Sequence, residues 1–182
     1  GKLWVSAFDV ESFIIDIRDY IVQKYPLPDL RNQLKANPAI NSLCKDEDGI
    51  FWFSQDRYGL CIYDSRKEKL KHYSQCQGTR NLPFGDVTNI ARSYNHNWIW
   101  ATSYGPTVFG LSQQNMEMKE DVRIELGNVT NNPGLITSLF EDPQNNLWIG
   151  TTTGLFVYRI MSATLESIPE LSLIHISEPT RP

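Results

Sequence analysis

The sequence predicts an all-β protein, a partial β-propeller of about three and a half four-stranded antiparallel blades. Three observations predict it: tryptophan recurs every 48 residues, short apolar runs alternate with turn residues, and units of this length are typical of propeller blades. The repeating residues are Trp4, Trp52, Trp100 and Trp148, and Trp98 is the one tryptophan outside this series. We therefore expect one blade around each of the four.

The units around the second and fourth tryptophans match each other best. Asp46 corresponds to Asp142, each six residues before its tryptophan. Gly59 corresponds to Gly154 once a one-residue slip is allowed. These residues are expected to have structural roles in every well-formed repeat.

Within the fourth unit, period-2 patterning and turn residues predict four short strands. The expected strands are residues 135–140, 147–151, 155–159 and 164–168. The second unit follows the same scheme, with a tight Asp48-Gly49 turn and a last strand at 70–73. Each unit thus reads as one antiparallel sheet.

The first unit is less clear, because apolar residues from Phe13 to Ile21 also fit one face of a helix. Strands are favoured, since segment 22–25 stands one 48-residue period before the strand at 70–73. For residues 28–37 we expect an extended, partly helical connection between blades.

A four-stranded sheet of this size exposes two faces, and it buries them by stacking against copies of itself. The recurring tryptophan is then expected to fill the gap between adjacent blades as a core residue. Its indole N–H needs a single hydrogen-bond acceptor there.

Composition excludes several functional classes. Lys and Arg number 17 against 21 Asp and Glu, with no sustained basic stripe, so no nucleic-acid partner is expected. The apolar runs are far shorter than the roughly 20 residues that span a bilayer, so this segment is expected to make no membrane contact. The 182 residues contain no phosphate-binding, dinucleotide-binding or nucleophile-elbow motif, and we predict no catalytic residue, metal or cofactor.

Three cysteines, Cys44, Cys61 and Cys76, lack metal-ligand spacing and are expected to be small core residues. A bridge between Cys44 and Cys61 stays open for an oxidising compartment. His72 and His96 have no neighbouring ligand residue and are expected to be solvated or hydrogen-bonded at the surface.

The pattern I-x-S-L-x-x-D-x-x-x-x-[LF]-W-[IF], followed by G-L-x-x-Y, resembles the two-component regulator propeller repeat. It stands at residues 40–63 and 136–158 and, in degraded form, at 87–109. The third unit departs most, with Trp98 added before Trp100 and one residue more between its first conserved segment and Trp100.

The resemblance implies a sensor region, in the periplasm or otherwise outside the cytoplasm, of an inner-membrane hybrid two-component system receptor. Such a region detects glycan fragments and signals to a histidine kinase. The partners implied are an oligosaccharide ligand, the remaining blades of a parent chain and a second receptor copy in a homodimer. A protein-interaction scaffold or an input domain for another output is the alternative, and a propeller lyase or hydrolase has less support.

Ligand sites in propellers lie where the turns between second and third strands meet the connections between blades. The candidate ligand-binding residues at this end are Asp56, Arg57, Tyr58, Ser103, Tyr104, Thr152 and Thr153. Tyr58 and Tyr104 are expected to stack on sugar rings, while Asp56 and Arg57 hydrogen-bond hydroxyl or carboxylate groups.

Residues 171–182 break the repeat abruptly and resemble the translation of a transposase sequencing adapter. We therefore expect residues 1–170 to be the natural segment, an incomplete propeller with fewer than the four blades that close a ring. Unprotected strand edges at both ends then predict that this chain, taken alone, is prone to aggregate or to unfold in part.

Overall fold

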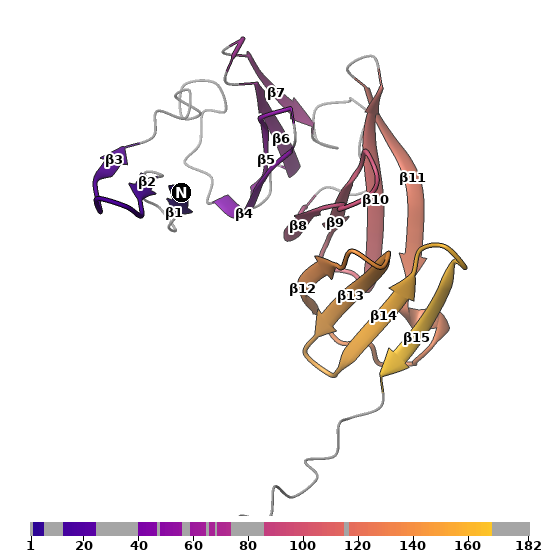
Figure 1. Ribbon diagram of the computed structural model, residues 1–182. Helices are drawn as coiled ribbons and strands as arrows, with labels where there is room; N and C mark the ends of the chain where they lie inside the picture. The colour runs from indigo at the N-terminus through magenta and orange to yellow at the C-terminus, as the bar shows by residue number, and fades with distance from the viewer. Residues whose placement is uncertain are drawn as a thin grey trace, which may run out of the picture.

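The structure is a computed structural model, and it describes residues 2–5, 13–24, 40–46, 48–55, 59–64, 66–67, 69–73, 86–114 and 117–168. In these ranges fifteen strands form four antiparallel sheets, in which neighbouring strands follow one another along the chain (Figure 1). We call the sheets blades 1 to 4 in chain order. The predicted fold class, an all-β partial propeller, is confirmed.

Blade 1 has three described strands: β1 (Lys2–Val5), β2 (Phe13–Asp16) and β3 (Val22–Lys24). The preference for strands over a helix in this region is therefore confirmed. The predicted connection at 28–37 and the adapter-like segment 171–182 lie outside the described residues.

Blades 2 to 4 each have four strands. Blade 2 contains β4 (Ile40–Lys45), β5 (Ile50–Gln55), β6 (Gly59–Asp64) and β7 (Lys69–Tyr73). Blade 3 contains β8 (Asn89–Arg92), β9 (Ile99–Thr102), β10 (Thr107–Gln114) and β11 (Glu117–Glu125), followed by the short 3₁₀ helix η2 (Leu126–Asn128). Blade 4 contains β12 (Ile136–Glu141), β13 (Asn146–Thr151), β14 (Leu155–Arg159) and β15 (Thr164–Ile168).

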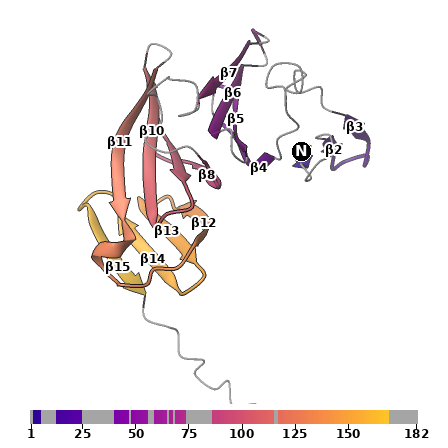
Figure 2. The same cartoon turned by 180° about the vertical axis from the view of Figure 1, so that it is seen from behind.

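The blades follow one another along an arc, as the two opposite views show (Figures 1 and 2). The first strands of blades 2, 3 and 4 lie next to each other, with β8 in contact with both β4 and β12. Polar side chains join these strands across the blades. Ser42 Oγ donates to the carbonyl of Ile90 at 3.1 Å, and Asn89 Nδ2 donates to the carbonyl of Ile136 at 3.3 Å. The 48-residue period thus brings equivalent strands side by side.

The core lies between blades, as predicted for the recurring tryptophans. Trp52 of blade 2 is buried against blade 3 residues such as Ile99 and Phe109. Trp100 of blade 3 is fully buried against blade 4 residues such as Ile149. Each ring therefore packs on the blade that follows it, whereas Trp148 of blade 4 is only partly buried.

A carboxylate in the first turn of the blade accepts the hydrogen bond of the indole. In blade 2, Asp46 Oδ2 accepts Trp52 Nε1 at 2.8 Å, while Oδ1 accepts a backbone N–H of the same turn. In blade 4, Asp142 Oδ2 accepts Trp148 Nε1, also at 2.8 Å. Although burial opposes it, the hydrogen bonds from Trp148 and Asn146 lower the pKa of Asp142. The aspartate that recurs in the sequence therefore orients the tryptophan.

Blade 3 departs from this scheme, because its first turn is one residue longer and carries Ser93 where the other blades carry aspartate. The backbone N–H of Ser93 donates to the carbonyl of Trp98, closing the turn as Asp46 does with Ile50. The indole of Trp100 instead donates to Glu141 Oε2, at 2.5 Å, at the end of the first strand of blade 4. The acceptor that Trp100 needs thus comes from the neighbouring blade.

Glu141 also fixes the turn that leads to Trp100. It is 3% exposed, and its Oε1 accepts the backbone N–H groups of Tyr94 and Asn95 at 3.1 and 3.3 Å. One buried carboxylate therefore ties the indole and the first turn of blade 3 to blade 4.

Neither of the two described cysteines forms a disulfide, so the bridge left open by the sequence is absent. Cys44 pairs with Trp52 across β4 and β5, whereas Cys61 pairs with Phe53 across β5 and β6. Since successive residues of a strand point to opposite faces, the two thiols lie on opposite faces of blade 2. Cys76 lies outside the described residues.

Replacing Glu141 should destabilise the chain more than its place at a strand end suggests. Glu141→Ala leaves Trp100 Nε1 and two backbone N–H groups without their acceptor, at a cost of roughly 2–4 kcal/mol in the free energy of unfolding. Urea denaturation followed by tryptophan fluorescence measures this loss. Glu166→Ala, which removes an exposed ion pair with Arg159, is the control and should change stability by less than about 1 kcal/mol.

The double variant Ser93→Asp/Glu141→Ala tests the cause of that loss. It places an aspartate where blades 2 and 4 have one, so we expect it to recover part of the lost stability. No recovery, together with a small effect of Glu141→Ala alone, would show that the carboxylate is not what secures Trp100.

The thiols of Cys44 and Cys61 should resist alkylation in the folded chain. Burial raises the pKa of both thiols. The pKa of Cys44 rises to about 12, because burial and, to a smaller extent, the Asp46 carboxylate raise it, while the charge of Arg92 lowers it. Because the neutral thiol is favoured in the fold, this contribution to stability is complete below the unfolded pKa near 9 and is lost as the pH rises toward 12. Iodoacetamide labelling with and without urea, read by peptide mass spectrometry, checks the expected resistance to alkylation. Rapid labelling of Cys61 in the folded chain would contradict it.

Candidate functional site

The structure places the described part of the predicted ligand site at one end of the blades. Ser103 and Tyr104 lie between β9 and β10, and Thr152 and Thr153 lie between β13 and β14. In antiparallel sheets these turns share an end with the connections between blades, as expected. Residues 56–58, which include the predicted Asp56, Arg57 and Tyr58, lie outside the described residues.

The threonines at this end hold the chain that enters blade 4. Thr152 Oγ1 accepts the backbone N–H of Leu135 at 3.0 Å, and Thr153 Oγ1 donates to the carbonyl of Asn132 at 3.2 Å. Gly134 lies close to both threonines and has φ +72°, and a Cβ at this position would lie 2.5 Å from Thr152 Oγ1. Both threonines thus have a structural role.

The equivalent turn of blade 3 also makes hydrogen bonds to the backbone, and it carries an exposed aromatic ring that the blade 4 turn lacks. The carbonyl of Ser103 accepts the hydroxyl of Thr88 at 3.2 Å, and Ser103 Oγ accepts the backbone N–H of Gly105 at 3.3 Å. Tyr104 is 60% exposed. Of the four described candidates, Tyr104 is the one whose ring faces solvent.

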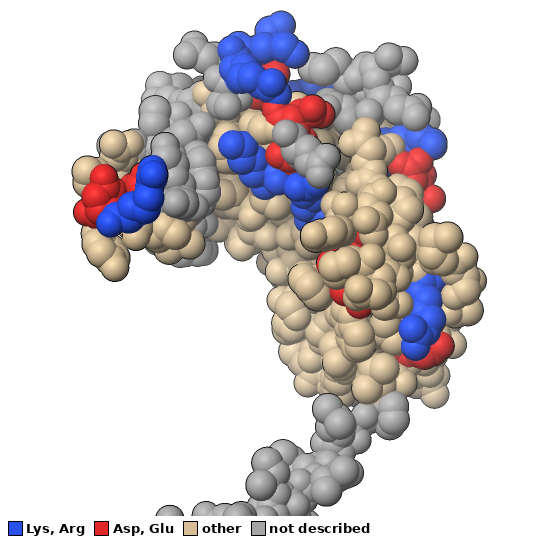
Figure 3. Space-filling view, in the orientation of Figure 1, with Lys and Arg blue, Asp and Glu red and all other residues tan. Residues whose placement is uncertain are grey.

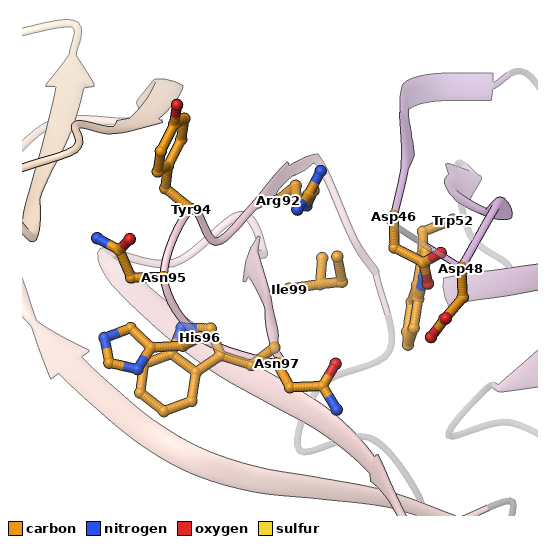
Figure 4. Close-up of a pocket in the computed structure, with 10 residues that line it drawn as sticks. Asp46, Asp48, Trp52, Arg92, Tyr94, Asn95, His96, Asn97 and Ile99 are labelled. Carbon is orange, nitrogen blue, oxygen red and sulfur yellow. The ribbon is translucent and has the colours of Figure 1, made fainter.

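A cavity of about 300 Å³ lies at the opposite end, between the first turns of blades 2 and 3 (Figure 4). The turn between β4 and β5 contributes Asp46 and Asp48 to one wall. The turn between β8 and β9 contributes a run of side chains from Tyr94 to Trp98 to the other, and Arg92 faces the two aspartates across the space. The sequence prediction did not include this end.

Two aromatic rings stack in the blade 3 wall of this cavity. His96 lies parallel to Trp98, with ring centroids 4.2 Å apart and 16° between planes, and Trp98 meets Trp100 edge-on at 5.5 Å. His96 Nε2 and Trp98 Nε1 are buried and have no hydrogen-bond partner in the described structure. The prediction that His96 is solvated or hydrogen-bonded at the surface is therefore wrong for Nε2, which stacking on Trp98 shields, while the residue as a whole is half-buried.

The wall is fixed from behind by blade 4. Glu141 accepts two of its backbone N–H groups, and Asn95 Nδ2 donates to Asn145 Oδ1 at 2.9 Å. The turn is thus preorganised by the next blade. The sequence signals that could have located it are the off-period Trp98 and the one-residue insertion.

The charges around the cavity are mixed, with Asp46 and Asp48 opposite Arg92. The visible face of the molecule likewise carries acidic and basic side chains interspersed (Figure 3). Among the described residues no group of three His, Cys, Asp or Glu could hold a metal ion. In the same ranges no helix is long and apolar enough to cross a membrane.

Comparison with known protein families and structures finds matches to this architecture. Residues 132–153 match the two-component regulator propeller model, so the chain carries this repeat, as its sequence resemblance predicts. No curated protein matches the chain.

Solved structures match over nearly the whole chain. The β-propeller domain of Cps50 (Swd1) from Myceliophteria thermophila has a TM-score of 0.71 at 11% identity, covering 93% of this chain and 56% of that one. The extracellular domains of the putative hybrid two-component systems BT3049 and BT4673 from B. thetaiotaomicron have TM-scores of 0.65 and 0.61 at 17% and 21% identity. They cover 91% and 92% of this chain, which spans 22% and 20% of theirs. At these identities the matches establish the propeller fold.

A methyl group at Gly134 should destabilise the entry into blade 4. Gly134→Ala adds a Cβ at a positive φ and against Thr152 Oγ1, so we expect a loss of about 1–3 kcal/mol in the free energy of unfolding. Gly127→Ala is the matched control, since a Cβ there meets nothing within 4 Å. Equal denaturation midpoints for the two variants would contradict this account of the connection.

Proposed function

We propose that this chain is a non-catalytic, ligand-sensing propeller segment of a hybrid two-component system receptor. The observation that carries the proposal is the regulator-propeller repeat at 132–153, set within blades that resemble extracellular domains of such systems. The receptor detects glycan fragments outside the cytoplasm and passes the signal to a histidine kinase. Its partners are the other blades of the receptor and a second receptor copy.

The packing of the blades supports a sensing role. Adjacent blades share continuous apolar cores, and side chains such as Glu141 hydrogen-bond across the boundary. A ligand that contacts two blades therefore changes the packing between them, which is the kind of differential contact that shifts a conformational equilibrium.

The candidate ligand end comprises the described residues Ser103, Tyr104, Thr152 and Thr153, together with Asp56, Arg57 and Tyr58 as the sequence predicts. Tyr104 is the described residue best suited to stack on a sugar ring, because it is exposed and aromatic.

A protein-interaction scaffold is the second candidate, and one observation favours it. Phe140 is 62% exposed and lies directly across the strands from Trp148, which is itself only partly buried. Apolar side chains grouped on one sheet face can bind another protein or another blade.

A reporter fused to the target promoter of the receptor tests the sensing proposal. In cells carrying the receptor, a glycan mixture should induce the reporter, and alanine at both Tyr58 and Tyr104 should reduce the response at limiting glycan. Glu166→Ala serves as the surface control. A receptor that responds to no glycan, while the purified chain captures a protein partner through Phe140, would favour the scaffold.

A further inference from the structure

We propose that the cavity between the first turns of blades 2 and 3 binds a neutral, polyhydroxylated molecule about the size of one sugar ring. This site lies at the end of the blades opposite Tyr104. The choice of a sugar-like ligand rests on the proposed sensing function. The cavity deepens that function as a second ligand site, whose wall residues differ from those around Tyr104.

The shape of the site supports a small ligand. A volume of about 300 Å³ is at the lower limit for ligand pockets, so the cavity has room for about one sugar ring. The walls come from two blades, and the blade 3 wall is held in place by Glu141 and Asn145 of blade 4. A preorganised wall reduces the entropy lost when a ligand binds.

The chemistry of the walls favours a neutral ligand. Asp48 presents an exposed carboxylate on one side, while Arg92 and the exposed Asn97 supply N–H donors on the other (Figure 4). A hydroxyl group both donates and accepts, so a polyol can bond to both walls at once. The walls carry both signs of charge, so an ion of either sign meets a repulsive as well as an attractive group, whereas a neutral polyol bonds to both walls without repulsion.

The stacked rings give the second, independent observation. Buried polar atoms are rarely without a partner, yet His96 Nε2 and Trp98 Nε1 both lack one in the described structure. Both residues line the cavity. A rotation of the stacked rings toward a bound polyol gives them hydroxyl partners, and Trp98 in turn contacts Trp100 of the interblade core. Occupancy is thereby coupled to the boundary between blades 3 and 4.

The blade 3 turn is built differently from its equivalents. Blades 2 and 4 carry Gly49 and Asn145 at a positive φ in tight turns closed by an aspartate. The longer turn of blade 3 carries three aromatic rings, those of Tyr94, His96 and Trp98, and two asparagines in place of that arrangement. The departure from the repeat therefore coincides with the cavity.

Indole N–H resonances of the ¹⁵N-labelled full chain test the proposal. The probes are D-galactose, D-galacturonate and D-galactosamine, which are a neutral, an anionic and a cationic form of one ring. We expect galactose to shift the Trp98 signal, assigned with Trp98→Phe, in a saturable manner. No shift at Trp98 with any probe, or tightest binding of a charged probe, would overturn the proposal.

Variants of exposed residues then locate the binding without perturbing the core. Asp48→Ala and Asn97→Ala should each weaken galactose binding about tenfold, the effect of removing one hydrogen bond to a ligand. Tyr104→Ala at the opposite end should leave it unchanged. If Tyr104→Ala abolishes binding while Asn97→Ala does not, the cavity assignment fails and the sensing function stands with its site at the other end.

Discussion

The hydrogen bond between a carboxylate and a tryptophan indole is the interaction on which the rest of the structure depends. The ring is large enough to fill the gap between two blades, but burying it also buries one N–H donor, which is costly without an acceptor. Asp46 and Asp142 supply that acceptor from the first turn of their own blades, and the same carboxylates accept backbone N–H groups there. The bond therefore fixes the turn, the ring and the surface presented to the next blade together.

Blade 3 receives its acceptor from a different place, and its packing changes with it. With Ser93 in the aspartate position, Trp100 depends on Glu141 of blade 4, so these two blades share a buried polar contact in addition to an apolar core. The first turn of blade 3 no longer closes over its own aspartate, and it carries His96 and Trp98 instead. The change from aspartate to serine and the one-residue insertion thus together link the interblade boundary to the wall of a cavity.

For the proposed site, this arrangement gives a physical route from ligand binding to blade packing. The cavity wall rests on Glu141 and Asn145 from behind, and Trp98 touches Trp100 within the core. A side chain that moves in the wall changes contacts at the next boundary, because close-packed interfaces transmit displacements instead of absorbing them. Exceptions to a structural repeat are therefore the positions to inspect for function, whereas the regular positions explain stability.

The sequence by itself determined the blades. A 48-residue period, turn residues at fixed offsets and period-2 patterning are local, so the strands of blade 4 and the strand preference in blade 1 could be predicted without coordinates. The role of the tryptophans as interblade core also followed, since a two-faced sheet must be covered. Only the tertiary structure decided which acceptor serves Trp100, that Cys44 and Cys61 point to opposite faces, and that His96 stacks on Trp98. The contact between Glu141 and Trp100 joins residues of different blades that stand 41 residues apart, so it leaves no mark in local pattern. The orientation of the cysteines and the stacking of His96 on Trp98 depend on the strand register and the turn conformation within one blade.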